Sequence, residues 1–472
     1  MKRIIVIYLL SIVLCPMSLF AQKDTVIVVE SEARVIEQDT TLTVVPTVVE
    51  SQKPKVESQE PKAESQELKG DSIAKDTTEG FRFTTIDSVA ITSVKDQHRS
   101  GTCWAFSTLG FLESEVLRTK GKVVEFAPMY VVSKTMIDRA TYCVRMYLEP
   151  NFAEGGSAYD VIYCMKHYGL VPKAAMPGIR YGWSEADSLP VHSELSKVTK
   201  GYIGALKGMK KLSPVWREGL QAIYDTYLGK CPEEFKYEGK KYTPQSFVES
   251  LGLDADDYIS LTSYTHHPFY QTFALEVPDN WRMDQMYNLP IDELMRVIDN
   301  AIANGYTLAW GADVSEIGFT RKGIGVVPDA DKGADLTGSD MAKWVGMSKD
   351  KQKEELTKKP LPEKEITQEM RQQAYDNWET TDDHGMQIFG TAKDQNGKRY
   401  YMVKNSWGAI KSDYKGIWYI SEAFMRYKTN DILVHKNAIP EDLRKKLGLW
   451  LGVDGLHLLG WYARYEFNHH YI

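Results

Sequence analysis

Apolar residues recur at near-helical intervals in the stretch that follows Cys103. These positions are Trp104, Phe106, Leu109, Leu112, Val116 and Leu117. Gly121 comes soon after the last of them, and glycine is a typical helix end because it adopts the left-handed backbone conformation easily. The pattern therefore predicts a helix that Cys103 opens and Gly121 stops.

Two later stretches have patterns of their own. Residues 289–305 predict a helix with a glycine stop, and residues 306–315 predict a buried strand directly after it. Residues 379–420 predict two strands around a turn at Asp394–Lys398. His384 lies in the first of these strands and Asn405 at the end of the second.

The N-terminus has a separate pattern. Two basic residues precede an apolar stretch at residues 4–20, and the small residue Ala21 follows it. This is typical of a signal peptide over residues 1–21, which predicts export to the periplasm or the cell exterior. An uncleaved membrane anchor is the alternative, but the run is short for a bilayer core and contains Pro16.

The composition changes in residues 22–80, where a repeated segment carries prolines and almost no large apolar side chains. Three near-copies, ESQKPKV, ESQEPKA and ESQELKG, follow one another from residue 50 at a seven-residue period. A coiled coil is not expected, because the seam would have nothing apolar to bury and the prolines would break the helix. The segment is interpreted as a disordered charged tether, and a propeptide stays open as the alternative.

Composition narrows the class of protein further. The chain has 472 residues, of which 43% are hydrophobic and 26% charged, as in ordinary soluble domains. Its net charge is −7, whereas nucleic-acid binders usually carry a basic face. Neither a multi-span membrane protein nor a nucleic-acid-binding protein is expected.

Candidate chemistry begins at Cys103. A thiol at a helix N-terminus lies at the positive end of the helix dipole, which is expected to lower its pKa and favour the thiolate. Such a cysteine is more often a small buried apolar residue. A nucleophile also needs a base and a group that orients the base, and His384 and Asn405 have those residue types. Trp407 follows shortly and could screen a His–Asn hydrogen bond from water.

With these residues in view, the chain resembles the papain-like cysteine peptidases, and more closely their bleomycin hydrolase and aminopeptidase C branch. The resemblance implies that Cys103 is the nucleophile, His384 the base and Asn405 its orienter. Gln97 would donate to the oxyanion, and its position six residues before Cys103 fits that role. The matching motifs are Gln97, Ser100-Gly101-Thr102-Cys103-Trp104-Ala105-Phe106, Asp383-His384-Gly385 and Lys404-Asn405-Ser406-Trp407-Gly408.

The number of residues between Cys103 and His384 indicates which branch of the family the chain resembles more closely. His384 follows Cys103 by 281 positions, whereas papain-type sequences separate the two by roughly 130–150. The resemblance implies an α+β, two-lobed papain-like fold over residues 81–472. One lobe is helical and holds the Cys103 helix, the other is β-rich and holds His384 and Asn405, and a large, mainly helical insertion covers about 181–362. It also implies that Gly155 and Gly156 line the substrate backbone, with Trp407 beside them.

The family likeness implies hydrolysis of peptide substrates through a thioester, with no cofactor, and a homohexamer as the possible oligomer. In that branch the chain's own C-terminal carboxylate can receive the substrate's α-ammonium, which makes the enzyme an aminopeptidase. Here the match ends near Leu449, and residues 450–472 depart from the family's usual ending. A papain-like endopeptidase, a catalytically silent binding protein and an amine-accepting acyl transferase stay open as alternatives.

The remaining histidines and cysteines say less about the function of the protein. The pairs His266-His267 and His469-His470 have neither i, i+4 spacing nor neighbouring acidic residues, so no metal site is expected. Cys15 lies in the expected signal peptide, and three further cysteines remain once Cys103 is assigned: Cys143, Cys164 and Cys231. A Cys143–Cys164 disulfide and three buried thiols are both compatible with export.

Overall fold

The computed structural model describes residues 80–150, 152–178, 188–329 and 348–449, all within one compact unit. The expected signal peptide, nearly all of the expected tether and the C-terminal stretch 450–472, with His469-His470, lie outside the described residues. Within the described ranges, no helix combines the length and the apolar character that crossing a membrane requires.

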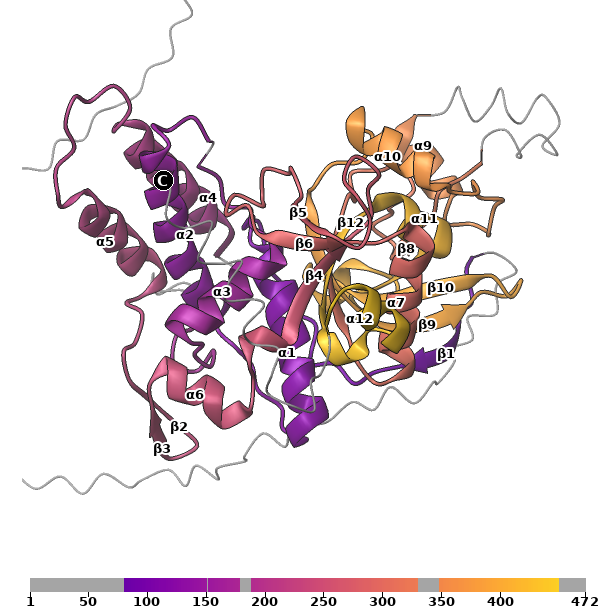
Figure 1. Cartoon of the computed structure of the whole chain (residues 1–472), viewed down its shortest axis with the longest axis horizontal. Coiled ribbons are helices and arrows are strands. Elements are labelled where there is room, and N and C mark those ends of the chain that lie inside the picture. Colours follow the sequence, from indigo (N-terminus) through magenta and orange to yellow (C-terminus); the bar gives the residue numbers. More distant parts are fainter. Residues whose placement is uncertain (1–79, 151, 179–187, 330–347, 450–472) are drawn as a thin grey trace, which may run out of the picture. The chain divides into compact units, whose positions relative to one another are not determined.

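Helices dominate the first half of the described chain (Figure 1). Their apolar faces share one large core that includes Phe111, Tyr130 and Val161. The helices are α1 (Cys103–Lys120), α2 (Pro128–Arg145), α3 (Ala158–Tyr168), α4 (Ser188–Gly204), α5 (Trp216–Leu228), α6 (Pro244–Leu251), α7 (Ile291–Ala303), α9 (Lys349–Glu355), α10 (Gln368–Asp376), α11 (Glu422–Lys428) and α12 (Glu441–Lys446).

Strands of the described chain form one ten-stranded, mostly antiparallel sheet and a small hairpin, β2–β3. The order in the sheet is β5-β6-β4-β12-β7-β9-β10-β11-β8, with β1 also paired to β9. The strands are β1 (Thr84–Ser88), β2 (Phe235–Tyr237), β3 (Lys240–Tyr242), β4 (Tyr258–Thr262), β5 (Thr272–Ala274), β6 (Gln285–Asn288), β7 (Leu308–Ala312), β8 (Ile324–Gly325), β9 (His384–Lys393), β10 (Arg399–Lys404), β11 (Ile417–Ser421) and β12 (Thr429–His435).

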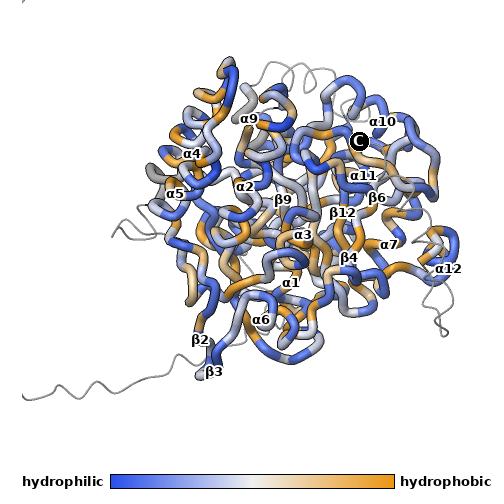
Figure 2. The backbone as a smooth tube through the Cα atoms, turned by 60° about the vertical axis from the view of Figure 1, so that its left-hand side comes forward, coloured by the Kyte–Doolittle hydropathy of each residue, from blue (hydrophilic) through white to orange (hydrophobic). Residues whose placement is uncertain are grey.

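Helix α1 lies between the helical part and the sheet, where it contacts α2, α3, β7 and β9 (Figure 1). The predicted start at Cys103 and stop at Gly121 are confirmed, and Gly121 has a φ of 61°. Gly110 lets the helix approach the sheet closely, because an added Cβ would lie 2.9 Å from Lys404 Nζ. Figure 2 shows hydrophobic residues along the central elements, among them β4 and β12, and hydrophilic residues along the outer loops.

The predicted hairpin is also confirmed. β9 pairs antiparallel with β10, and Arg399 faces Lys393 across the turn. The Asp394 side chain closes that turn by accepting from the backbone N–H groups of Asn396 and Lys398, each at 2.9 Å. The predicted helix and strand at 289–315 are α7 and β7, with β7 paired between β12 and β9.

The expected, mainly helical insertion at about 181–362 has a mostly helical first part, whereas its later part combines strands with helices α7 and α9. Helix α5 packs on α2 and on α4, and α6 packs on α3. From Tyr258 onward the chain instead supplies β4, β6 and β7 to the large sheet. The reason is that residues such as Leu261 and Leu308 are fully buried and complete the sheet's own core with α7. The domain boundaries themselves stay predictions.

The Cys143–Cys164 disulfide is absent from the structure. Cys103, Cys143, Cys164 and Cys231 are all free thiols. Cys143 and Cys164 are fully buried within the helical core, so the alternative of buried thiols describes these two.

Candidate active site

Cys103 is the first residue of α1, and the turn before it is fixed by Glu154. The Glu154 carboxylate accepts from the Gly101 N–H at 2.9 Å, and its carbonyl oxygen accepts from Trp104 Nε1 at 3.0 Å. These two bonds tie both sides of Cys103 to the segment before α3. The thiol is therefore held at a rigid helix start.

Gly385 brings β9 against this helix start. A Cβ at Gly385 would lie 3.2 Å from Trp104 Cα and 2.8 Å from Ser107 Oγ, so only glycine fits without a shift. The N–H groups of Gly385 and Trp104 both lie within hydrogen-bonding reach of the Cys103 sulfur. Because His384 directly precedes Gly385, this approach brings the part of β9 that carries the histidine to the start of α1.

His384 and Asn405 meet across the hairpin. The His384 Nε2 atom lies 2.8 Å from Asn405 Oδ1, which also accepts from the Ser406 N–H at 2.7 Å. The Trp407 ring packs on the His384 ring with centroids 4.7 Å apart. His384 is 6% exposed and Asn405 is 2% exposed. The bond is therefore shielded from water, and it leaves His384 Nδ1 available to the thiol.

Burial governs the charge of both groups. It raises the pKa of Cys103 to about 12, with Asp279 and Asp382 adding to the rise. It lowers the pKa of His384 to about 4 although the Asn405 hydrogen bond acts in the opposite direction. The expectation that the helix start lowers the thiol's pKa is therefore wrong, because desolvation outweighs the dipole. The site favours a neutral thiol beside a neutral imidazole.

Gln97 lies next to Asn405 through Ser406. Its Oε1 accepts from the Ser406 hydroxyl at 2.5 Å, and its Nε2 donates to the Ser100 carbonyl at 2.8 Å. These bonds fix which end of the amide faces which way. Since Nε2 carries two hydrogens, one donor remains for a ligand beside the Ser100–Cys103 turn.

The predicted substrate-lining glycines lie beside the same turn. A Cβ at Gly156 would lie 2.9 Å from the Trp104 ring, so this backbone packs directly on the residue after Cys103. A Cβ at Gly155 would collide with the carboxylate of Asp279. The structure thus brings together Cys103, His384, Asn405, Gln97, Trp407, Gly155 and Gly156.

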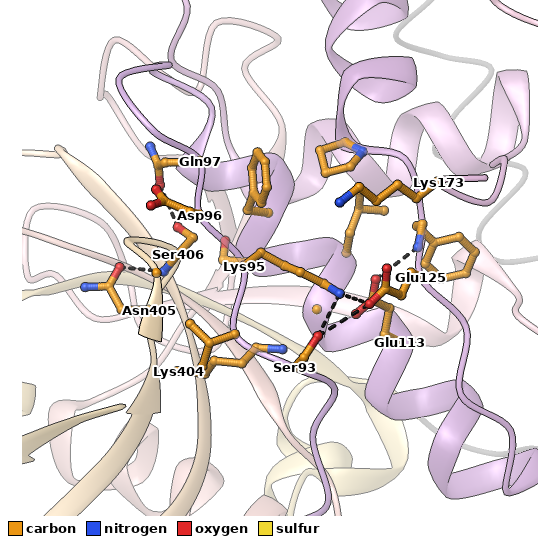
Figure 3. Close-up of a pocket in the computed structure, with 18 of the residues that line it drawn as sticks. Ser93, Lys95, Asp96, Gln97, Glu113, Glu125, Lys173, Lys404, Asn405 and Ser406 are labelled. Carbon is orange, nitrogen blue, oxygen red and sulfur yellow. Dashed lines mark hydrogen bonds and ion pairs between the residues drawn. The ribbon is translucent and has the colours of Figure 1, made fainter. Parts of the chain in front are cut away.

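A cavity of about 460 Å³ reaches this machinery from the side of Gln97, Asn405 and Ser406. Figure 3 shows Ser406 joined to Gln97, with Lys404 pointing toward the carboxylates beyond. Burial lowers the pKa of Lys404 to about 8, and nearby Glu113 opposes that change. Cys103 and His384 do not line the cavity, so it contains the supporting polar network rather than the reacting atoms.

One group of described residues has metal-ligating types. His266 Nε2 and His267 Nε2 lie 3.1 and 3.2 Å from the two carboxylate oxygens of Glu276. The expectation that this histidine pair has no acidic neighbour is therefore wrong, because the segment after β5 returns beside it.

Sequence reasoning missed Asp279, Asp382 and Glu154. Asp279 lies between β5 and β6, 176 positions after Cys103, and nothing in the local pattern marks it. Asp382 and Glu154 stand beside recognised motifs, two residues before His384 and one before Gly155. Their position beside these motifs was the only sequence feature that could have indicated that Asp382 and Glu154 lie near the site.

A cysteine at a helix start, a buried His–Asn pair on a facing strand and a two-part α+β architecture define a papain-like cysteine peptidase. The chain belongs to the Peptidase C1-like family, whose pattern matches residues 122–331 and 363–461. The match contains His384 and Asn405 and begins after Cys103.

Similar proteins of known name are consistent with this family. The chain is 24% identical to Aminopeptidase G of Lactobacillus delbrueckii subsp. lactis over 397 residues, which cover 75% of this chain and 83% of the relative. It is 24% identical to Aminopeptidase C of Listeria monocytogenes over 392 residues, covering 75% and 82%. The crystal structure of PepW from Lactobacillus rhamnosis HN001 has a similar fold, with a TM-score of 0.54 at 18% identity over 78% of this chain and 85% of that one.

Proposed function

We propose that this protein is a cysteine aminopeptidase that releases the N-terminal residue of peptides through a thioester on Cys103. The observation that carries the proposal is the buried His384–Asn405 bond, 2.8 Å long, beside a thiol that opens a helix. The aminopeptidase activity rests on the names of the relatives, among them aminopeptidases C, E, G and W.

Acylation begins with a proton transfer. His384 Nδ1 takes the proton of the Cys103 thiol, and the thiolate attacks the substrate carbonyl carbon. Burial opposes an isolated charge on either group, so the two charges form together as an ion pair that offsets part of the desolvation cost. Asn405 holds the imidazolium by accepting from its Nε2–H, and Trp407 keeps water from that bond.

The attack produces a tetrahedral intermediate with a negative oxygen. The free hydrogen of Gln97 Nε2 and the Cys103 backbone N–H are the donors for it, and loss of one such donor costs on the order of 3–4 kcal/mol. The C–N bond then breaks, and the amine leaves with the proton held by His384. Water, deprotonated by His384, finally hydrolyses the thioester and restores the thiol.

Two measurements test this proposal. A thiol-directed epoxide followed by peptide mapping is expected to label Cys103, with activity lost in proportion. A peptide with a free N-terminus is expected to be cut from that end, whereas its N-acetylated form is cut poorly. Equal cleavage of both peptides would contradict the aminopeptidase assignment and favour an endopeptidase. Labelling only at Cys143, Cys164 or Cys231 would show that Cys103 is not the nucleophile.

Export is part of the same proposal. The basic, apolar and small-residue pattern of residues 1–21 supports it. N-terminal sequencing of the protein from its native host is expected to begin near Gln22, and a chain that retains residues 1–21 would contradict cleavage. The homohexamer implied by the resemblance stays a prediction.

A further inference from the structure

Asp279 lies on the substrate side of the site although it belongs to neither catalytic motif. It precedes β6, and its carboxylate fills the space directly above Gly155. Gly156 follows Gly155 and packs on Trp104, which follows Cys103. Two close contacts, Asp279 with Gly155 and Gly156 with Trp104, thus connect the carboxylate to the residue beside the nucleophile.

Its charge reaches the reacting sulfur. Asp279 and Asp382 both raise the pKa of Cys103 by their negative charge, after the larger effect of burial. Charges separated by much more than ~10 Å would be screened where water has access. The Asp279 carboxylate therefore lies near the sulfur. Burial raises the pKa of this carboxyl group and Arg139 acts in the opposite direction, and an ammonium bound beside it would favour the charged form further.

The carboxylate is fixed rather than loose. Arg139 Nη1 lies 3.7 Å from Asp279 Oδ1, and the same guanidinium donates to the Gly155 carbonyl and, at 3.4 Å, to the Pro278 carbonyl. Arg139 is 2% exposed and Asp279 is 25% exposed. The arginine thus holds the carboxylate on its buried side, and the other side stays open to a ligand.

The chemistry of acylation says which ligand group lies there. When a substrate carbonyl carbon bonds to the Cys103 sulfur, its α-nitrogen is only ~2.5 Å from that carbon. In an N-terminal residue this nitrogen is an ammonium, and in an internal residue it is a neutral amide that carries more chain. The ammonium also reduces the repulsion between Asp279 and Asp382, which act on each other through their charges.

We propose that Asp279 binds the α-ammonium of the substrate's N-terminal residue and that its position over Gly155 blocks a longer chain. This inference rests on the aminopeptidase proposal and identifies the anchor within the described part of the chain. The anchor comes from the segment between β5 and β6 and does not require the C-terminal carboxylate.

The test compares kcat/KM for a free peptide and its N-acetylated form in the full-length enzyme. Asp279→Asn is expected to lower the preference for the free peptide by about ten- to hundredfold, because a charged hydrogen bond is lost. The loss should fall mainly on KM of the free peptide, and the acetylated peptide should be cut at least as well as before. Asp279→Ser is the second uncharged variant, should the first fail to fold.

Two controls separate charge from structure. Glu276→Gln removes a half-exposed carboxylate from the same segment and is expected to keep the preference. Asp279→Glu retains the negative charge and is expected to keep the preference for the free peptide, with a higher KM. A chain without its last four residues should also keep it.

The outcomes are distinguishable. A wild-type enzyme that cuts both peptides equally would overturn the aminopeptidase proposal together with its anchor. The role of Asp279 alone would be overturned in two cases. In the first, Asp279→Asn keeps the wild-type preference, for example because both peptides lose kcat/KM equally. In the second, C-terminal truncation abolishes the preference.

Discussion

His384 shows how burial sets the resting state of the site. One ring nitrogen bonds to Asn405, and the Trp407 ring covers that contact. Desolvation lowers the pKa of the imidazole to about 4, and only the Asn405 hydrogen bond acts against it. The histidine is therefore neutral at pH 7 and ready to accept the proton of Cys103.

This charge state predicts a pH dependence of stability. As pH falls from 6.5 to about 4, the unfolded chain binds a proton on His384 and the folded chain does not. The folded state thus loses roughly 1.4 kcal/mol per pH unit in this window from His384. His384→Gln is expected to remove that loss, so its stability relative to wild type should improve by roughly 2–3 kcal/mol between pH 7 and pH 4.5.

Chemical denaturation of both proteins at several pH values measures this difference. The other titrating groups are common to the two proteins and cancel in the comparison. Parallel stability curves would mean that folding does not depress the pKa of His384, as in a resting Cys103–His384 ion pair.

At the scale of elements, the site depends on how closely β9 approaches α1. Gly385 permits this approach because a Cβ at this position would press on the backbone of Trp104 and the side chain of Ser107. The Gly385 N–H also reaches the Cys103 sulfur. Strand β9 thus both carries the base, His384, and sets the distance between this base and the nucleophile, Cys103.

Gly385→Ala is expected to reduce kcat at least about tenfold, since small misplacements in active sites have such effects. Overpacking at this contact should also lower the free energy of unfolding by about 1–3 kcal/mol. Steady-state kinetics and denaturant titration measure the two effects.

Gly201→Ala is the matched control. Gly201 lies in α4 with nothing near the added methyl group, so this change should preserve activity and stabilise the helix by up to about 1 kcal/mol. Full activity in Gly385→Ala would show that the spacing between β9 and α1 is not critical.

At the scale of the whole chain, the site lies where two cores meet. One core joins the helices of the first half, and the other joins α7, α11 and α12 with the sheet. Ala309 of β7 and Leu433 of β12 pack into the helical core, so the sheet and the helices are not independent. Residues that are 281 positions apart meet because of this junction.

Residues 22–79 are predicted to be a tether outside the folded domain. Their removal is expected to leave the melting temperature within a few degrees and the peptidase rate nearly unchanged, because few core-forming side chains are lost. Differential scanning calorimetry and a peptide assay of the shortened protein check this. A large rise in activity after removal would show instead that the segment is an inhibitory propeptide.

The sequence by itself determined the local elements and the types of reacting group. The helix from Cys103 to Lys120 and the hairpin with His384 and Asn405 follow from short-range periodicity and turn chemistry, which act within a few residues. Gln97, Gly155 and Gly156 were recognisable through the family resemblance that the sequence motifs carry.

Only the tertiary structure decided what depends on distant segments. The strands after Tyr258 join the large sheet because their burial is completed by β12 and α7. Glu276 reaches the two histidines, and Asp279 reaches Gly155, through folding of the segment after β5. The pKa of Cys103 rises where helix position alone predicted a fall, since desolvation comes from the packing of the whole chain around the sulfur.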